Sequence, residues 1–179
     1  DRYHKPELSV AFSRRLNSEN LVQETATAAS QRLAVKLLPQ TYAVGISTDA
    51  HQLRTTRGTL VYTDLILALG SRPFLPKALS AASYWHMNHL ETWSKLKQAL
   101  GDSPKRVAVV GAGMIGCELS EDLAKAGHQV TLINDKATPL PGLLPVEAAE
   151  YLIHALRRLG VAYIGNATIT TTGENTQGE

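Results

Sequence analysis

The stretch VVGAGMIGCELSEDL, from Val109 to Leu123, decides the fold of this chain of 179 residues. Its three glycines, Gly111, Gly113 and Gly116, have the spacing G-x-G-x-x-G. The run RVAVV before them is typical of a buried strand, and the residues after them have the apolar spacing of a helix. A glycine motif between a strand and a helix predicts the first turn of a dinucleotide-binding domain.

Each glycine has a separate role in such a turn. Gly111 permits the tight turn that leaves the strand, Gly113 lets the backbone approach a pyrophosphate, and Gly116 lets the helix pack closely on the strand. The helix N-terminus offers free N–H groups and the positive end of a dipole to the phosphates. We therefore expect these glycines, and Ile115 among them, to bind a nucleotide cofactor. A glycine-rich turn without a ligand is the alternative interpretation.

The end of the second strand is where an acid should bind the ribose, about 20 residues after the first glycine. QVTLI fits that strand, and Asn134 and Asp135 follow it. No arginine lies in the segment INDKATP, so a 2′-phosphate would lack a bidentate partner, which favours NAD over NADP. Lys136 weakens this argument, because its ammonium could meet a phosphate as a simple charge.

Strands and helices alternate after the glycine motif. MIGCELSEDLAKAG and VEAAEYLIHALRRLG predict helices that stop at Gly127 and Gly160, and RVAVV, QVTLI and VAYIG predict strands. In the first helix we expect Ile115, Leu119, Leu123 and Ala126 to form one apolar face. The alternation predicts an α/β fold with a doubly wound, parallel sheet of the Rossmann type.

The residues before the glycine motif have a different pattern. SENLVQETATAASQRL, beginning at Ser18, predicts one helix, and RLAVKLL, up to Pro39, predicts a strand. Short apolar runs over residues 41–69 predict a β-meander of three or four strands, with a tight turn at Arg57-Gly58 and a buried last run, LILAL. A break rich in glycine and proline follows, after which HLETWSKLKQALG predicts an amphipathic helix.

Composition excludes several classes of protein. The net charge of +2 is too small to indicate a surface that binds nucleic acid. The sequence has no run of eighteen apolar residues, so we expect no membrane-spanning helix.

The single cysteine, Cys117, cannot form a disulfide within the chain and fits a cytoplasmic location. A helix N-terminus could make this thiol reactive, but burial against the sheet is the favoured interpretation. Only His86 and His89 have metal-ligand spacing, without a third ligand nearby, so we expect no metal site.

Four stretches resemble the FAD-dependent pyridine-nucleotide oxidoreductases, most closely the branch of rubredoxin and flavorubredoxin reductases. They are YHKPELS, YTDLILALGSRP, VAVVGAGMIGCELSEDLAKAGHQVTLI and PLPGLLPVEAAEYL, and they follow the family's order along nearly the whole chain. Leu69 departs from the pattern, since the family usually has threonine there. In that family the NAD-binding domain is inserted into the FAD-binding domain. The resemblance implies a partial FAD-binding domain at 1–74, an incomplete NAD-binding domain at 75–179, and therefore a fragment of a longer protein.

The resemblance also implies an activity. Such enzymes transfer hydride from NADH to FAD, and the reduced flavin passes single electrons to a small iron protein such as rubredoxin. By the same resemblance Lys5 lies beside the flavin, Glu118 pairs with it where the nicotinamide docks, and Ala43 is a further cofactor-binding residue. From the residues alone, the favoured interpretation is that Lys5 is a solvated loop lysine and Glu118 a first-turn acid, and the resemblance reverses that preference. A plain NAD-dependent dehydrogenase and a non-catalytic NAD-binding module remain the alternatives. The dehydrogenase does not explain YHKPELS or the meander.

Overall fold

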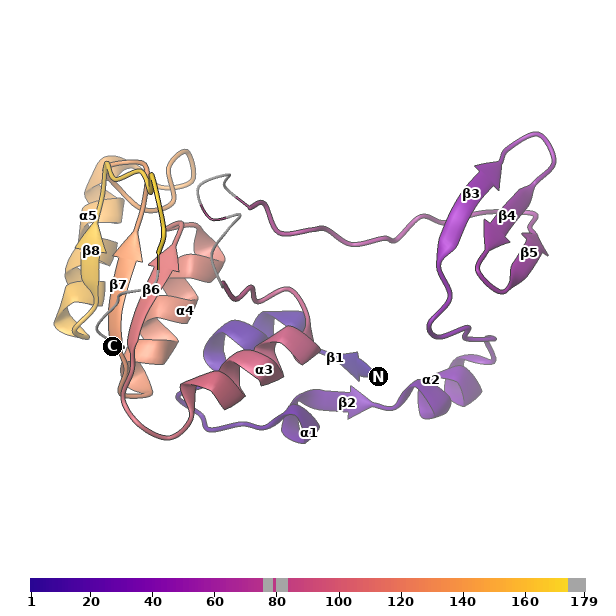
Figure 1. The fold of residues 1–179 in the computed structure, drawn as a ribbon, viewed down its shortest axis with the longest axis horizontal. Helices are drawn as coiled ribbons and strands as arrows, with labels where there is room; N and C mark the ends of the chain where they lie inside the picture. Colours follow the sequence, from indigo (N-terminus) through magenta and orange to yellow (C-terminus); the bar gives the residue numbers. More distant parts are fainter. Residues whose placement is uncertain (76–78, 80–83, 174–179) are drawn as a thin grey trace. The chain divides into compact units, whose positions relative to one another are not determined.

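The computed structural model of the protein describes residues 1–75, 79 and 84–173 (Figure 1). Strands and helices occur together along the described chain, with three separate small sheets in the orders β1-β2, β3-β4-β5 and β6-β7-β8. The predicted α/β class is therefore confirmed.

Two units make up the chain. Unit 1 comprises Asp1–Arg2 and Glu24–Arg72, and unit 2 comprises Tyr3–Gln23 and Pro73–Glu179. The second boundary lies close to the break expected after residue 74. The N-terminal segment of unit 2, however, comes from the part of the chain that we assigned to an FAD-binding domain.

The parallel sheet of unit 2 is the predicted Rossmann-type element. Its strands are β6 (Arg106–Val110), β7 (Gln129–Ile133) and β8 (Ala162–Ile164), all parallel and in sequential order. α4 (Met114–Lys125) joins the first two strands, and α5 (Val146–Arg158) joins the last two. Both helices are followed within two residues by a glycine of positive φ, as the sequence predicted. The two helices contact each other beside the sheet.

The buried face of α4 differs from the predicted one. Ile115, which we expected on the same face as Leu123, is 59% exposed, whereas Ser120 and Leu123 are fully buried. The cause is the close approach of the helix to the strand end: a Cβ at Gly116 would lie only 1.9 Å from the carbonyl oxygen of Gly111. This contact fixes the rotation of the helix, so that residues 116, 120 and 123 form its inner face.

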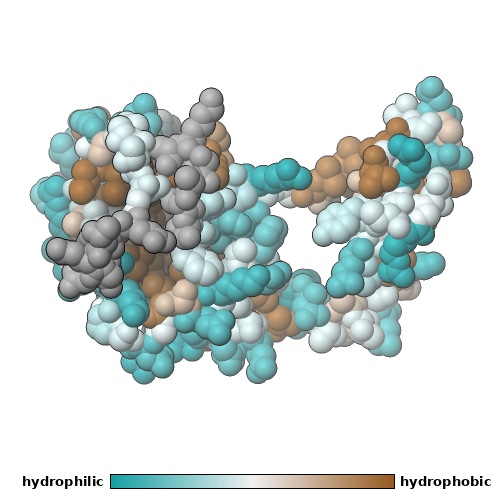
Figure 2. Space-filling model, in the orientation of Figure 1, coloured by the Kyte–Doolittle hydropathy of each residue, from teal (hydrophilic) through white to brown (hydrophobic). Residues whose placement is uncertain are grey.

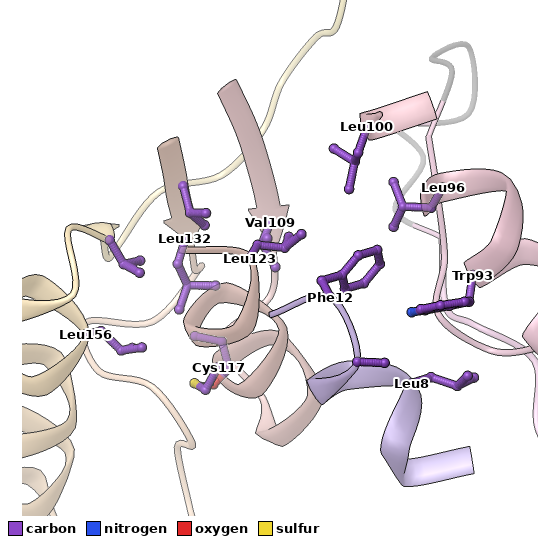
Figure 3. Close-up of a cluster of buried hydrophobic side chains, with 14 of the residues drawn as sticks. Leu8, Phe12, Trp93, Leu96, Leu100, Val109, Cys117, Leu123, Leu132 and Leu156 are labelled. Atoms are coloured by element: carbon purple, nitrogen blue, oxygen red, sulfur yellow. The ribbon is translucent and has the colours of Figure 1, made fainter. Parts of the chain in front are cut away.

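The N-terminal segment of unit 2 packs against α3 and α4. Its elements are a 3₁₀ helix, η1 (Lys5–Val10), and the short helix α1 (Ser18–Leu21), and α3 (Leu90–Leu100) is the predicted amphipathic helix. One buried apolar cluster joins η1, α3, α4 and the parallel sheet (Figure 3). Within it the rings of Phe12 and Trp93 lie 5.3 Å apart between centroids. Unit 2 therefore has a single core that includes residues far apart in the sequence.

The helix predicted to begin at Ser18 and continue to Leu33 is wrong. The chain leaves α1 after one turn and forms β2 (Val22–Glu24), which pairs with β1 (Arg2–Tyr3), before α2 (Ala26–Leu33) begins. The side chain of Thr25 caps α2 by accepting a hydrogen bond from a backbone N–H of its first turn. A new cap and strand pairing override the helical spacing, because tertiary pairing satisfies the backbone equally well.

The strand predicted for RLAVKLL, residues 32–38, is also wrong. Its first two residues complete α2, and Ala34 ends that helix in the left-handed conformation at φ 51°. Residues 35–38 follow without regular structure. Alternation over so short a run does not outweigh a helix that is already capped.

Unit 1 contains the predicted β-meander. β3 (Ala43–Ser47), β4 (Gln52–Thr55) and β5 (Gly58–Val61) form an antiparallel sheet in sequential order. The tight turn lies at Thr56 and Arg57, one residue before the predicted position, and Gly58 opens the next strand at φ 117°.

The last predicted run of the meander, LILAL, is not a buried strand. Residues 65–69 have no regular structure, and Ile66 and Leu69 are 88% and 83% exposed. Apolar side chains also lie on the surface of the sheet, among them Val44 and Val61, and Figure 2 shows brown surface over unit 1. A short apolar run indicates burial only where another element covers it, which sequence alone does not reveal.

Candidate functional site

The glycine loop connects β6 to α4 in unit 2. Gly111 leaves the strand at φ 97°, and its N–H donates to the carbonyl of Ile133 on β7 at 2.8 Å. Gly113 is the N-cap of α4, which begins at Met114 without an acidic residue in its first turn. The first N–H groups of a helix have no partner within it. This helix end is therefore suited to an anion such as a pyrophosphate.

Two glycines of the motif are required for different reasons. A Cβ at Gly116 would collide with the backbone of Gly111 at 1.9 Å, whereas a Cβ at Gly113 would meet no atom within 4 Å. Gly116 is therefore needed for the packing of the chain on itself. The open space at Gly113 is what a ligand needs to approach the backbone closely, and it fits a bound dinucleotide.

Asn134, predicted to contact the ribose, has its side chain occupied within the protein. The residue is 7% exposed, and its Oδ1 accepts from the N–H of Ala112 in the glycine loop at 3.1 Å. Its Nδ2 donates to the carbonyls of Lys136 at 3.3 Å and Thr138 at 3.1 Å. The carboxamide thus ties the glycine loop to the loop after β7. An aspartate could not make the two donor contacts.

Asp135 is the acid that remains available at the end of β7. Its side chain is 64% exposed and lies 3.4 Å from the ammonium of Lys136, which is 62% exposed. The residues that follow this pair pack closely against Gly165, since a Cβ at Gly165 would lie 2.5 Å from the carbonyl oxygen of Ala137. The predicted ribose acid therefore lies exposed after β7, next to Lys136, whose ammonium could meet a 2′-phosphate.

Lys5 and Glu118 belong to two elements that pack against each other, η1 and α4. The ammonium of Lys5 donates to Asn88 Oδ1 at 2.6 Å, and Ser9, on the same 3₁₀ helix, donates from Oγ to Glu118 Oε2 at 2.7 Å. Within the described residues Lys5 and Glu118 form no ion pair, so the predicted direct pairing is absent from this structure. Glu118 lies on the second turn of α4, not the first, because the helix begins at Met114.

Asp122 holds the junction between η1 and α4 and was missed by the sequence analysis. Its side chain is 3% exposed and accepts from the backbone N–H groups of Phe12 at 2.6 Å and Ser13 at 3.1 Å, and also from the Ser13 hydroxyl. Ser9, which is 4% exposed, was missed as well, although it belongs to the quoted segment YHKPELS. An acid four residues after Glu118 on the same helix was the one available indication.

Cys117 is a buried thiol below the glycine loop. Burial, with a smaller contribution from the charge of Glu118, raises the pKa of this thiol to about 11. Its Sγ lies 3.6 Å from the carbonyl oxygen of Ala112. The interpretation as a packing residue is therefore favoured over a reactive role, since the thiolate is the nucleophilic form.

Ala43, the remaining predicted cofactor-binding residue, lies in unit 1, where it opens β3 and pairs with Thr55. The other predicted residues all lie in unit 2. Ile115 is exposed in the first turn of α4, beside the glycine loop.

Two further properties concern the described residues only. No group of three or more histidine, cysteine, aspartate or glutamate side chains in residues 1–75 and 84–173 could hold a metal ion. No helix in this part of the chain is both long and apolar enough to cross a membrane.

Known proteins are similar to this chain in sequence and in fold. The family described as pyridine nucleotide-disulphide oxidoreductase matches residues 2–178. A nitric oxide reductase FlRd-NAD(+) reductase of Escherichia coli O17:K52:H18 is 33% identical over 161 residues, which are 90% of this chain and 42% of that protein. This chain thus spans less than half the length of that relative.

Two solved structures have the same fold. A chain of the covalent putidaredoxin reductase–putidaredoxin complex superposes with a TM-score of 0.87 at 26% identity, covering 98% of this chain and 43% of the other. The NADH:rubredoxin oxidoreductase of Clostridium acetobutylicum superposes with a TM-score of 0.78 at 19% identity, covering 94% and 44%. The second likeness concerns the fold alone.

Proposed function

Because this chain belongs to the pyridine nucleotide-disulphide oxidoreductase family, we propose that it forms the dinucleotide-binding part of a flavoprotein reductase. The whole enzyme would pass electrons from NADH through FAD to a small iron protein such as rubredoxin. The names of two similar proteins support this proposal, since they are a flavorubredoxin–NAD(+) reductase and a putidaredoxin reductase in complex with putidaredoxin.

One observation carries the proposal: the segment with Lys5 is bonded to the helix that follows the glycine loop. The bond from Ser9 to Glu118 joins residues 109 positions apart. In a plain NAD-dependent dehydrogenase the glycine loop has no need of such a segment. In a flavin enzyme it would bring a cation to the edge of the nucleotide site.

The residues of unit 2 have distinct tasks in this proposal. The N-terminus of α4, with Gly111, Gly113, Ile115 and Gly116, would hold the pyrophosphate of NADH. FAD, when bound, accepts the hydride and releases single electrons. Lys5, which is exposed in this structure, would stabilise negative charge at the flavin. Ala43 in unit 1 is proposed to contact a cofactor through the family resemblance alone.

NADH is the proposed donor rather than NADPH. Asp135 presents an exposed carboxylate at the ribose position, which would accept hydrogen bonds from the hydroxyls and repel a 2′-phosphate. Lys136 is partly neutralised by its contact with that carboxylate. Asn134 supports the site indirectly, by fixing the glycine loop.

The proposed electron acceptor is an iron protein, not a disulfide. The chain has one cysteine, Cys117, which is buried and has a raised pKa. The printed name of the flavorubredoxin–NAD(+) reductase to which the chain is 33% identical supports an iron protein as the acceptor. We also propose a cytoplasmic location, which the free thiol of Cys117 supports.

An absorption spectrum of the purified whole protein tests the proposal. We expect flavin bands in the visible region and their rapid bleaching by NADH under anaerobic conditions, followed by reoxidation when oxidised rubredoxin is added. A folded, colourless protein that binds NADH would contradict the proposal and would favour a plain dehydrogenase or a non-catalytic NAD-binding module. A flavoprotein that NADH does not bleach would contradict it as well.

A further inference from the structure

Asp122 carries a carboxylate that is almost wholly removed from water, with an exposed fraction of 3%. Its neighbour Leu123 and its partner Phe12 both belong to the buried apolar cluster. Burying a carboxylate is costly unless hydrogen bonds and opposite charges compensate for the lost hydration, and an apolar residue often fills such a position at lower cost. Packing alone therefore does not account for this residue.

The carboxylate of Asp122 accepts hydrogen bonds from one short segment, residues 12–13. Both oxygens accept hydrogen bonds, one from the N–H of Phe12 at 2.6 Å and the other from the N–H and the hydroxyl of Ser13. In the described part of the chain Asp122 takes part in no ion pair. Hydrogen bonds to an ionised acceptor are stronger than neutral ones. They fasten the residues that follow η1 to the middle of α4.

A second carboxylate of α4, one turn earlier, binds the same segment at a different place. Glu118 accepts from Ser9 on η1, and the two acids are four residues apart, so they lie on one side of the helix. Glu118 differs from Asp122 in being exposed, and the Ser9 hydroxyl also lies 3.0 Å from the carbonyl of Pro6. Ser9 can therefore keep a partner when Glu118 turns to another group.

We infer that Asp122 is a positioning residue: it holds the segment that carries Lys5 in fixed register with the helix that carries Glu118. This inference rests on the proposed function, in which Lys5 serves the flavin side and Glu118 the nicotinamide side of one site. The permanent contact is made by the buried acid, which leaves the exposed acid free to exchange Ser9 for a ligand. A small displacement of a positioned group is enough to slow a reaction between two bound partners.

Asp122→Asn is the variant that tests this role. Asparagine has nearly the same shape, but its amide nitrogen would face the donors of Phe12 or Ser13 and break part of the clamp. The matched control is Glu121→Gln, which removes a neighbouring charge on the exposed side of α4, where Glu121 contacts Lys125. Both variants are prepared in the whole protein with its flavin.

Two measurements are made on each variant. Hydrogen exchange of the amides of Phe12 and Ser13 reports whether the clamp has opened. Stopped-flow reduction of the flavin over a range of NADH concentrations separates the limiting rate from the Kd for NADH. For Asp122→Asn we expect faster exchange at both amides and a limiting rate lowered roughly tenfold, with a Kd within about twofold of wild type. Glu121→Gln should change neither.

The outcomes separate positioning from simple stability. Faster exchange with an unchanged limiting rate would overturn the inference, because Asp122 would then only stabilise the fold. If Asp122→Asn does not fold, Ser13→Ala replaces it: this variant removes the hydroxyl contact alone, and an unchanged limiting rate would again overturn the inference. A wild-type protein without flavin would contradict the proposed function instead, and the exchange comparison would still report on the clamp.

Discussion

Two regions beside α4, the glycine loop at its N-terminus and the junction of its middle with η1, are stabilised in opposite ways. At the glycine loop the structure depends on missing atoms, since Gly116 has no room for a Cβ and Gly113 leaves space for a ligand. At the junction with η1 it depends on particular atoms being present, since Ser9 and residues 12–13 are held by carboxylate oxygens. Adding a methyl group should therefore disrupt the glycine loop, and removing a carboxylate charge should disrupt the junction with η1.

Adding a methyl group at Gly116 should have the largest effect on stability. Gly116→Ala places a Cβ against the carbonyl of Gly111, and we expect a loss of about 3 kcal/mol in the free energy of unfolding, because the strand and helix must separate. Urea denaturation followed by circular dichroism measures it.

Gly113→Ala is the matched control for that prediction. Its Cβ would meet no atom of the protein, so the free energy of unfolding should change by less than about 1 kcal/mol while NADH binding weakens. Equal destabilisation by the two substitutions would refute the distinction between a packing glycine and a ligand glycine.

The same contrast shows how much of the site could be predicted from the sequence. The glycine loop was predicted because its contacts join residues five positions apart, where spacing alone carries the information. Asp122 and Phe12 are 110 positions apart, and the spacing of Asp122 from Glu118 on α4 does not indicate which distant residues Asp122 contacts. The apolar spacing of the sequence predicted the parallel sheet and α3. The break between α1 and α2 depends on the pairing of β2 with β1, and apolar spacing does not indicate such a pairing.

Substitution of Asn134 should have the next largest effect on stability. Its side chain is bonded both to the glycine loop and to the loop after β7. Asn134→Asp keeps the acceptor for Ala112 but turns an oxygen toward the carbonyls of Lys136 and Thr138. We expect a loss of about 2 kcal/mol in the free energy of unfolding, because two donor contacts are replaced by repulsion. Urea denaturation measures it, and an unchanged or increased stability would show that this position accepts the acid usual in such sites.

Asp135→Ala should weaken NADH binding without destabilising the fold. Removing the exposed carboxylate should raise the Kd for NADH about tenfold, equivalent to about 1.4 kcal/mol. Because Lys136 then loses its acidic neighbour, NADPH should bind better than before, and the ratio of kcat/KM for the two cofactors measures the change. Asp49→Ala, at an exposed turn of unit 1, is the control. A wild-type preference for NADPH would count against the assignment of Asp135.

His128 should give the smallest effect, visible as a dependence of stability on pH. Burial, together with the charge of Lys105, lowers the pKa of this histidine below 6.5, and the backbone N–H of Lys105 donates to its Nδ1 at 3.2 Å. The unfolded chain therefore binds the proton more readily, so the free energy of unfolding should decrease as the pH falls below 6.5. His128→Asn should flatten this part of the pH profile, and an unaltered profile would assign the dependence to other groups.

The account depends most on Lys5 and Glu118 acting together where the two cofactors meet. Stopped-flow reduction of the flavin at saturating NADH tests this directly, with Lys95→Met, on the exposed side of α3, as the control. We predict that Lys5→Met slows flavin reduction about 10²-fold, equivalent to about 2.7 kcal/mol, and that Lys95→Met does not. The loss in Lys5→Met combined with Glu118→Gln should be smaller than the sum of the single losses. A rate for Lys5→Met within about twofold of wild type would contradict the account.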